Sequence, residues 1–311
     1  MDPHGLRTRR SLLDAGSTAA EIRRMRSSGT LALVRRGAST DPADDRLETP
    51  EARHALLVQA TLPLLAKGSV ISHASAAVLH GLRLWAVRLD QVHVTRDATS
   101  GGRTSRRLHL HTARLHDDEV VEVDGVAVTS LARTAVDLAR TLPYEQAVVA
   151  VDSALDLRRA RTPGRAPLTR VDWDDAIGRA TGWPGGPAAR RVGRFAADGA
   201  ESAGESRSRI AIVAAGLPPP VLQLVVPRVA HGADGRVDFA WREQRVVGEF
   251  DGRVKYGRLL APGQEAGDAV FAEKVREEAI RAASWTVLRW TWGELREFGP
   301  VAARLRRALD G

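Results

Sequence analysis

The chain of 311 residues contains no cysteine and only two methionines and two tyrosines. The absence of cysteine excludes disulfide bonds and thiolate metal sites, which is typical of a cytoplasmic protein. No apolar run approaches the ~18 consecutive residues that a membrane span requires, so a membrane helix is excluded. The N-terminus has no apolar run ending at a small-residue cleavage site, so no signal peptide is expected. We expect a cytoplasmic protein without a membrane partner.

Lysine is also scarce, because only three of the 46 basic residues are lysines. The basic residues outnumber the 38 acidic ones, which gives a formal net charge of +8. A strongly basic chain favours an anionic partner, and nucleic acid is the commonest one. The apolar content of 43% is ample for real cores. The length predicts two or three domains, at ~100–200 residues per domain.

The first 36 residues contain eight arginines and three acids. A short helix over 11–16 ends at a glycine, and a second helix over 17–25 begins with Ser-Thr and an acid near its first turn. With the β-like run at 29–37, the segment looks like a winged helix-turn-helix, whose second helix enters the major groove of double-stranded DNA. A protein-docking module is the alternative. The predicted DNA contacts lie on the second helix and the wing: Arg23, Arg24, Arg26, Arg35 and Arg36.

Two strand-like runs at 236–241 and 245–252 alternate apolar and polar residues around a short polar link. A tight antiparallel turn centred on that link places Asp238 directly opposite Glu249. Opposed side chains have Cβ atoms roughly 5 Å apart, and two like charges there are destabilising unless something neutralises them. Hard divalent metals prefer carboxylate oxygens, so the hairpin predicts a metal site. The alternative is a solvated sheet edge on which the acids pair with neighbouring arginines.

The hairpin also resembles a known family. Asp238, an eleven-residue step and then Glu249-Phe250-Asp251 are similar to the (Asp)…(Glu)-x-Lys core of the restriction-endonuclease-like nucleases. Within that superfamily the chain most resembles the branch of the very-short-patch-repair endonucleases. The upstream helix carries Glu201 and Glu205, and a strand at 222–226 follows it. Downstream come a charged helix at 268–284 and a last strand at 285–290.

The resemblance covers about residues 195–311 and implies an α/β/α domain with a mixed central sheet. It also implies Mg²⁺ or Mn²⁺ as cofactor and hydrolysis of DNA phosphodiester bonds. The implied metal ligands are Asp238, Glu249, the Phe250 carbonyl and Glu205. The position of the usual catalytic lysine is occupied by Asp251, which would bind a second metal or orient water, and the nearest lysine is Lys255. Candidates for phosphate contact on the upstream helix are Arg207 and Arg209.

The middle of the chain shows a second resemblance. The segments ISHASAAVLHGL at 71–82 and VTSLARTAVDLAR at 128–140 are similar to the regulator region of the AbiEi-type antitoxins of type IV toxin–antitoxin systems. This resemblance covers about residues 5–160. It implies a transcriptional autoregulator in which a winged helix precedes an α/β domain. A nucleotidyltransferase-like toxin is then a candidate partner.

Histidines are concentrated in the same region. His73 and His80 are seven residues apart and share a face of a helix, where we expect them to cap or pack rather than to bind metal. Four more lie in or beside two strand-like runs: His93, His109, His111 and His116. A zinc site is one interpretation. A basic, partly protonatable strand that faces phosphate is the simpler one, because no close His-x-x-x-His pair supports zinc.

Together these patterns predict an α/β multidomain chain. A winged-helix-like DNA-binding module occupies 1–45, a regulator-like α/β domain 46–160, a linker with a short helix 161–194, and a restriction-endonuclease-like domain 195–311. Three functions from different classes remain open. The first is a Mg²⁺-dependent DNA endonuclease with a DNA-binding front end. The second is an antitoxin or regulator whose nuclease fold serves only binding. The third is a protein-interaction adaptor.

Overall fold

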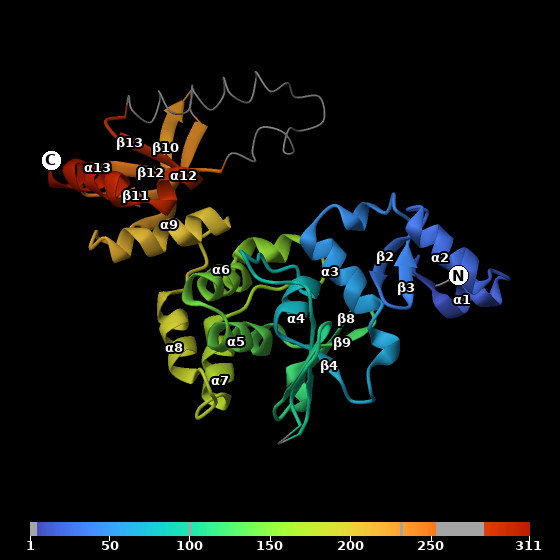
Figure 1. Cartoon of the computed structure of the whole chain (residues 1–311). Coiled ribbons are helices and arrows are strands. Elements are labelled where there is room, and N and C mark those ends of the chain that lie inside the picture. The colour runs from blue at the N-terminus through green and yellow to red at the C-terminus, as the bar shows by residue number, and fades with distance from the viewer. Residues whose placement is uncertain (1–4, 99–100, 231–232, 253–282) are drawn as a thin grey trace. The chain divides into compact units, whose positions relative to one another are not determined.

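The computed structural model describes residues 5–98, 101–230, 233–252 and 283–311 (Figure 1). The chain divides into two compact units. Unit 1 comprises residues 1–142 and 168–193, and unit 2 comprises 143–167 and 194–311. Both units mix helices with sheets, so the α/β multidomain prediction is confirmed at that level. No helix within the described residues is long and apolar enough to cross a bilayer.

Unit 1 begins with a small helical module and a three-stranded antiparallel sheet of order β1-β3-β2. Thr18 starts α2 with a capping box to Glu21, as the sequence predicts. Leu12, Ile22 and Leu31 form the buried centre of the module. Its elements are β1 (Arg7–Thr8), α1 (Arg9–Asp14), α2 (Ala19–Ser27), β2 (Ala32–Arg35) and β3 (Ala38–Thr40).

The rest of unit 1 is built on a six-stranded mixed sheet of order β6-β7-β5-β4-β9-β8. Valines and isoleucines of its central strands pack against α3 and α4 to form the core. The strands are β4 (Val70–Ile71), β5 (Val92–Arg96), β6 (Arg103–Thr104), β7 (Leu108–Thr112), β8 (Val120–Val123) and β9 (Val126–Thr129). The helices are α3 (Pro50–Gln59), α4 (His73–Leu79), α5 (Leu131–Thr141), α7 (Arg170–Arg179) and α8 (Gly186–Phe195). Short 3₁₀ turns lie at Asp45–Leu47, Leu62–Leu64 and Asp117–Glu119.

Unit 2 holds a four-stranded mixed sheet of order β10-β11-β12-β13, in which β13 runs parallel to β12 and the other pairs are antiparallel. Phe239, Phe250 and Trp290 lie in one buried cluster with residues of α9 and α13. The elements are α6 (Tyr144–Leu155), a 3₁₀ turn at Leu157–Arg161, α9 (Ala203–Ala214), β10 (Val221–Ala230), β11 (Ala233–Trp241), β12 (Val246–Asp251), β13 (Thr286–Thr291), α12 (Trp292–Arg296) and α13 (Gly299–Asp310). The helix predicted at 268–284 falls almost entirely outside the described residues.

The unit boundaries differ from the predicted domains in two places. Residues 144–155, predicted to end the middle domain, form α6 and pack against α9 of unit 2. The predicted linker 161–194 carries α7 and most of α8, and α7 packs on α5 of unit 1. The segment 161–167, rich in proline and glycine, therefore ends where the chain passes from unit 2 into unit 1, whereas the return to unit 2 falls near the end of α8.

Candidate functional site

The predicted carboxylates lie in a polar row across the sheet of unit 2. In the β11–β12 register Phe239 faces Gly248 as the last paired residues, and Asp238 and Glu249 lie one step further outward on the two strands. Glu249 also lies beside Arg289 of the parallel strand β13. On the other side, Leu222 faces Phe239 in the β10–β11 register, which puts Gln223 opposite Asp238. One polar row therefore crosses all four strands.

Protein groups partly neutralise the two opposed acids. The backbone N–H of Phe250 donates to Asp238 Oδ2 at 2.9 Å. Arg289 Nη2 lies 2.8 Å from Glu249 Oε2, and the Glu249 side chain is 9% exposed. The predicted need for a cation is thus met in part by a hydrogen bond and an ion pair. The Phe250 side chain is buried against Trp292, and its carbonyl oxygen stays a predicted ligand.

Glu205 adds a third acid from the first turn of α9. Its carboxylate accepts hydrogen bonds from the Glu201 N–H at 2.7 Å, the Ser202 hydroxyl at 2.7 Å and the Gln223 amide at 3.0 Å. Burial raises the pKa of Glu205 to about 7, and the nearby charge of Asp238 adds to the effect. Glu205 and Asp238 are therefore electrostatically coupled, as expected for members of one site.

Two other predicted members of the site, Asp251 and Lys255, lie outside this group of acids or outside the described residues. Asp251 ends β12 opposite Thr291 and is half-buried. Lys255 lies outside the described residues. Within the part of the chain that the structure describes, the acids of this row do not form a group of three mutually close ligand atoms. A metal bound here would draw the carboxylates together or complete its shell with water.

The arginines of α9 occupy two different environments. Arg207 forms an ion pair with Glu145 at 3.0 Å, and its guanidinium lies 5.7 Å from the ring centre of Trp292. Arg209 is buried, and its Nη2 lies 3.0 Å from both carboxylate oxygens of Asp152. The predicted phosphate contact therefore needs correction for Arg209, because its guanidinium is held inside unit 2. Arg236, which could have neutralised the hairpin acids, forms an ion pair with Glu201.

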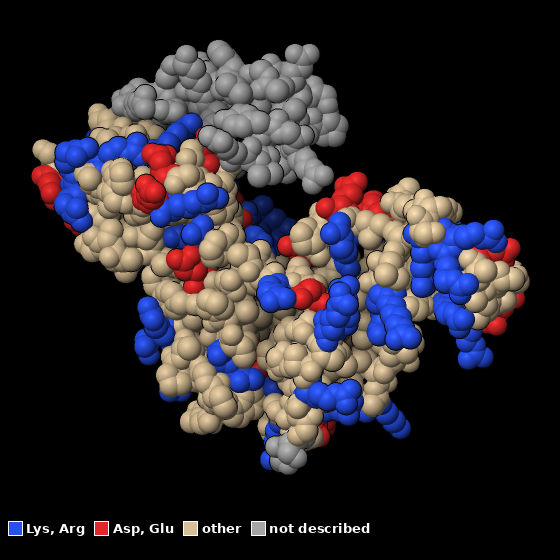
Figure 2. All heavy atoms as spheres, viewed as in Figure 1, with Lys and Arg blue, Asp and Glu red and all other residues tan. Residues whose placement is uncertain are grey.

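The predicted DNA contacts of the N-terminal module are also divided. Arg23 and Arg24 are exposed on α2, and Arg26 is half-buried. Figure 2 shows basic side chains gathered over the region of α1 and α2. Arg36 is exposed between β2 and β3, but Arg35 turns inward and donates to the hydroxyl of Thr61 at 3.0 Å. Burial lowers the pKa of Arg35. Arg35 is thus placed in the packing beneath the hairpin.

Sequence reasoning missed two members of the polar row, Gln223 and Arg289. Arg289 interrupts the apolar run Val287-Leu288-Arg289-Trp290, and this charged residue between apolar ones was the available signal. Among the histidines, His80 bonds the Thr129 carbonyl at 2.8 Å, and His116 starts a 3₁₀ turn. His73 joins the histidines of β5 and β7, which the sequence did not suggest.

Comparison with known proteins finds no matching family model. The chain is 34% identical over 191 residues to two proteins of Mycobacterium tuberculosis, Uncharacterized protein MT2308 of strain CDC 1551 / Oshkosh and Uncharacterized protein Rv2248 of strain H37Rv. The match covers 60% of this chain and 64% of the length of these relatives. The RV2827C protein of Mycobacterium tuberculosis has a solved structure with a TM-score of 0.39 and 13% identity, covering 73% of this chain and 84% of that one. That likeness is too distant to carry an argument.

Proposed function

We propose that the chain is a DNA-binding protein whose unit 2 is a divalent-metal-dependent nuclease domain that hydrolyses DNA phosphodiester bonds. The observation that carries the proposal is the polar row itself, in which Asp238 and Glu249 lie on adjacent strands and Glu205 joins the row by accepting from Gln223 at 3.0 Å. Burial, with the nearby charge of Asp238 as a second cause, raises the pKa of Glu205 to about 7, and a cation bound there would stabilise the charged form. The order α9-β10-β11-β12, with β13 parallel to β12, agrees with the nuclease resemblance.

The donor atoms fit Mg²⁺ or Mn²⁺, because all are hard oxygens of carboxylates and a carbonyl. Asp238, Glu249 and the Phe250 carbonyl would hold the ion, with Glu205 bound directly or through water. When bound, the ion would lower the pKa of a water molecule and stabilise charge on the phosphate. The Phe250 N–H fixes the orientation of Asp238. Arg289 supplies a positive charge beside Glu249, in a region where the expected lysine position holds Asp251.

The N-terminal module supports binding of double-stranded DNA. A capped helix that exposes Arg23 and Arg24 precedes a hairpin that exposes Arg36, in the order of a winged helix-turn-helix. In this proposal α2 enters the major groove, and the hairpin approaches the phosphates.

A second function is favoured by one specific observation. Arg289 forms an ion pair with Glu249 at 2.8 Å, and Asp251 stands at the position of the usual lysine. Both features suit a regulator or antitoxin whose nuclease fold serves only binding, with a nucleotidyltransferase-like toxin as its partner. The two functions differ in whether a divalent ion binds the row and supports cleavage.

The deciding experiment is a plasmid-nicking assay of the full chain with Mg²⁺ or Mn²⁺. Asp238→Asn and Glu249→Gln should each lower the cleavage rate more than ~100-fold, above the 10–100-fold typical of outer-shell partners. Glu243→Gln, which makes the same change on the exposed hairpin turn, should leave the rate unchanged. Lys255→Ala tests whether the displaced lysine has kept the phosphate-facing role.

Thermal unfolding provides a readout independent of activity. Mg²⁺ should raise the melting temperature of the wild type and of Glu243→Gln, but not of Asp238→Asn, because only a folded state that binds the ion gains by mass action. A wild type that gains no stability from Mg²⁺ or Mn²⁺, and that cleaves no duplex, single strand or mismatch, would contradict the nuclease function. The regulator function would then replace it.

A further inference from the structure

Three histidines from three elements of unit 1 meet at one point. His73 is the first residue of α4, His93 lies on β5 and His111 on β7. One nitrogen from each ring lies within 4.8 Å of the others. His93 Nδ1 and His111 Nε2 are 3.0 Å apart, and the rings of His73 and His111 are stacked with centroids 3.7 Å apart. Such a trio on separate elements results from the fold rather than from sequence proximity.

The polar surroundings of His73 suit a metal ligand. Its side chain is 3% exposed, and its Nε2 has no hydrogen-bond partner among the described residues, because the carboxylate oxygen Oδ1 of Asp137 is 4.0 Å away. Buried imidazole nitrogens are normally satisfied, so an orphaned one asks for an explanation. The other nitrogen, Nδ1, lies 3.0 Å from the Ser72 hydroxyl, which accepts from Thr95 at 2.8 Å. Metal-bound histidines commonly donate their second N–H in this way, which fixes the ring and its tautomer.

The backbone and charge state of the trio point the same way. His73 has a φ of 51°, a left-handed conformation that a residue with a side chain rarely adopts and that concentrates at functional positions. Burial is the main cause that lowers the pKa of His93 to about 4 and of His111 to about 2, and it also lowers the pKa of His73 well below its usual value. The rings are therefore neutral near pH 7, which is the form that binds metal.

We propose that His73, His93 and His111 bind a divalent transition-metal ion of the zinc class. Imidazole nitrogen suits Zn²⁺, Co²⁺ and related ions and does not suit Mg²⁺, so this site is chemically distinct from the carboxylate row. Binding would replace the hydrogen bond between His93 Nδ1 and His111 Nε2 with two metal–nitrogen bonds, and the ring that donates this hydrogen bond would carry its proton on its other nitrogen. Three protein ligands leave a fourth position of a tetrahedral ion for water or a ligand.

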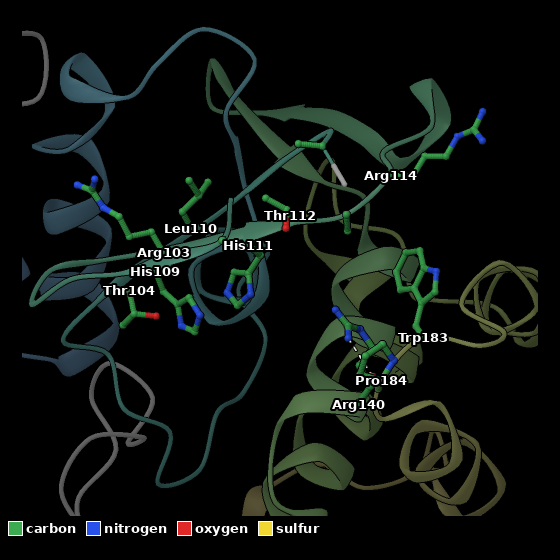
Figure 3. Close-up of a pocket in the computed structure, with 13 residues that line it drawn as sticks. Arg103, Thr104, His109, Leu110, His111, Thr112, Arg114, Arg140, Trp183 and Pro184 are labelled. Atoms are coloured by element: carbon green, nitrogen blue, oxygen red, sulfur yellow. Dashed lines mark hydrogen bonds between the residues drawn. The ribbon is translucent and has the colours of Figure 1, made fainter. Parts of the chain in front are cut away.

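The site lies at the wall of a cavity of about 650 Å³ that His111 lines (Figure 3). Arg103, Arg114 and Arg140 line the same cavity. Arg140 is held there by Asp137 at 3.0 Å and by the Pro184 carbonyl at 3.0 Å. Arginines around a cationic centre favour an oxyanion, so the ligand at the open position belongs to the phosphate or carboxylate class.

Equilibrium titration of the chelator-treated full chain with Zn²⁺ tests the proposal. The wild type should bind one Zn²⁺ per chain at this site, and His111→Gln should weaken its affinity roughly tenfold or more. His109→Gln is the matched control, because His109 lies two residues away on β7, stacks on His111 and is not one of the three ligands. Its affinity should equal that of the wild type. Equal losses in the two variants would overturn the assignment, and so would a wild type that binds no zinc.

X-ray absorption of the zinc-loaded wild type needs no variant and therefore holds even if His111→Gln fails to fold. Histidine nitrogens should dominate the first shell, and a shell of oxygens alone would overturn the proposal. Asp238→Asn should bind Zn²⁺ at the histidines like the wild type, so the result is independent of the nuclease proposal. Adding inorganic phosphate or acetate to the zinc-loaded chain identifies the oxyanion class. Replacement of the fourth ligand by neither anion would exclude the oxyanion part.

Discussion

Glu205 couples the protonation of one side chain to the stability of unit 2. Its pKa rises from about 4.5 to about 7 on folding, because the carboxyl group is buried and Asp238 is near. Between these values the folded state binds more protons than the unfolded state, so stability falls as the pH rises. The contribution of the protonated group is complete below about pH 4.5 and is lost as the pH rises through about 7.

Glu205→Gln should therefore flatten the pH dependence of stability. Glutamine keeps a polar side chain of the same length but does not titrate, so the variant avoids the cost of up to ~3 kcal/mol that the raised pKa imposes near pH 8. Urea unfolding without metal at pH 5, 6.5 and 8 measures the effect. The exposed Glu243→Gln should show the same pH dependence of the free energy of unfolding as the wild type. If Glu205→Gln also showed it, protonation of Glu205 would not be linked to stability.

At the residue scale, the sequence predicted members of the polar row only where a short turn determines which residues of two strands lie side by side. A short polar link and strict alternation were enough to place Asp238 opposite Glu249. Arg289 could not be placed, because the register of a parallel strand depends on a long crossover rather than on a turn. Gln223 faces Asp238 through the β10–β11 register, which joins strands that the sequence did not predict to pair. The grouping of His73, His93 and His111 could not be predicted for the same reason, because β5 and β7 are parallel strands.

Between elements, the Arg209–Asp152 ion pair joins α9 to α6 within unit 2. Asp152 is fully buried and also accepts the Ala197 N–H at 2.9 Å. Arg209→Ala should destabilise unit 2 by about 3–5 kcal/mol, because it leaves a buried carboxylate without its partner. The double variant Arg209→Ala/Asp152→Ala should recover part of that loss, and with the single variant Asp152→Ala it completes a double-mutant cycle. Denaturant unfolding of all four proteins gives the cycle, and additive losses would argue against direct coupling.

At the element scale, the packing partner of α6 could not be predicted from the sequence. Residues 147–155 are buried on every side, so no polar stripe indicates which neighbour the helix packs against. Chain proximity favoured the middle domain. The partner is instead α9, which follows some 60 residues later, and only a tertiary contact such as Arg209–Asp152 assigns α6 to unit 2.

For the whole molecule, the net charge of +8 predicts salt-sensitive binding to DNA, and the exposed α2 predicts where it begins. Reversing Arg23 and Arg24 to glutamate should weaken duplex binding and reduce the slope of log K against log salt by about 2, one unit per lost phosphate contact. Fluorescence anisotropy over a salt series measures it. The control reverses the exposed pair Arg190 and Arg191 on α8, which changes the net charge by the same amount and should leave the slope as in the wild type. If both pairs gave the wild-type slope, the contact would lie in unit 2.

The division of each unit between two separate stretches of chain has a consequence for biosynthesis. Helix α6 leaves the ribosome before α9, and the interval of some 60 residues takes ~3–12 s at ~5–20 residues per second. Throughout that time α6, whose buried residues include Val148 and Val151, lacks its contacts with α9. Unit 1 also waits for residues 168–193. The nascent chain therefore exposes an apolar helix at the stage when chaperones bind and aggregation begins, and slower translation would lengthen that exposure.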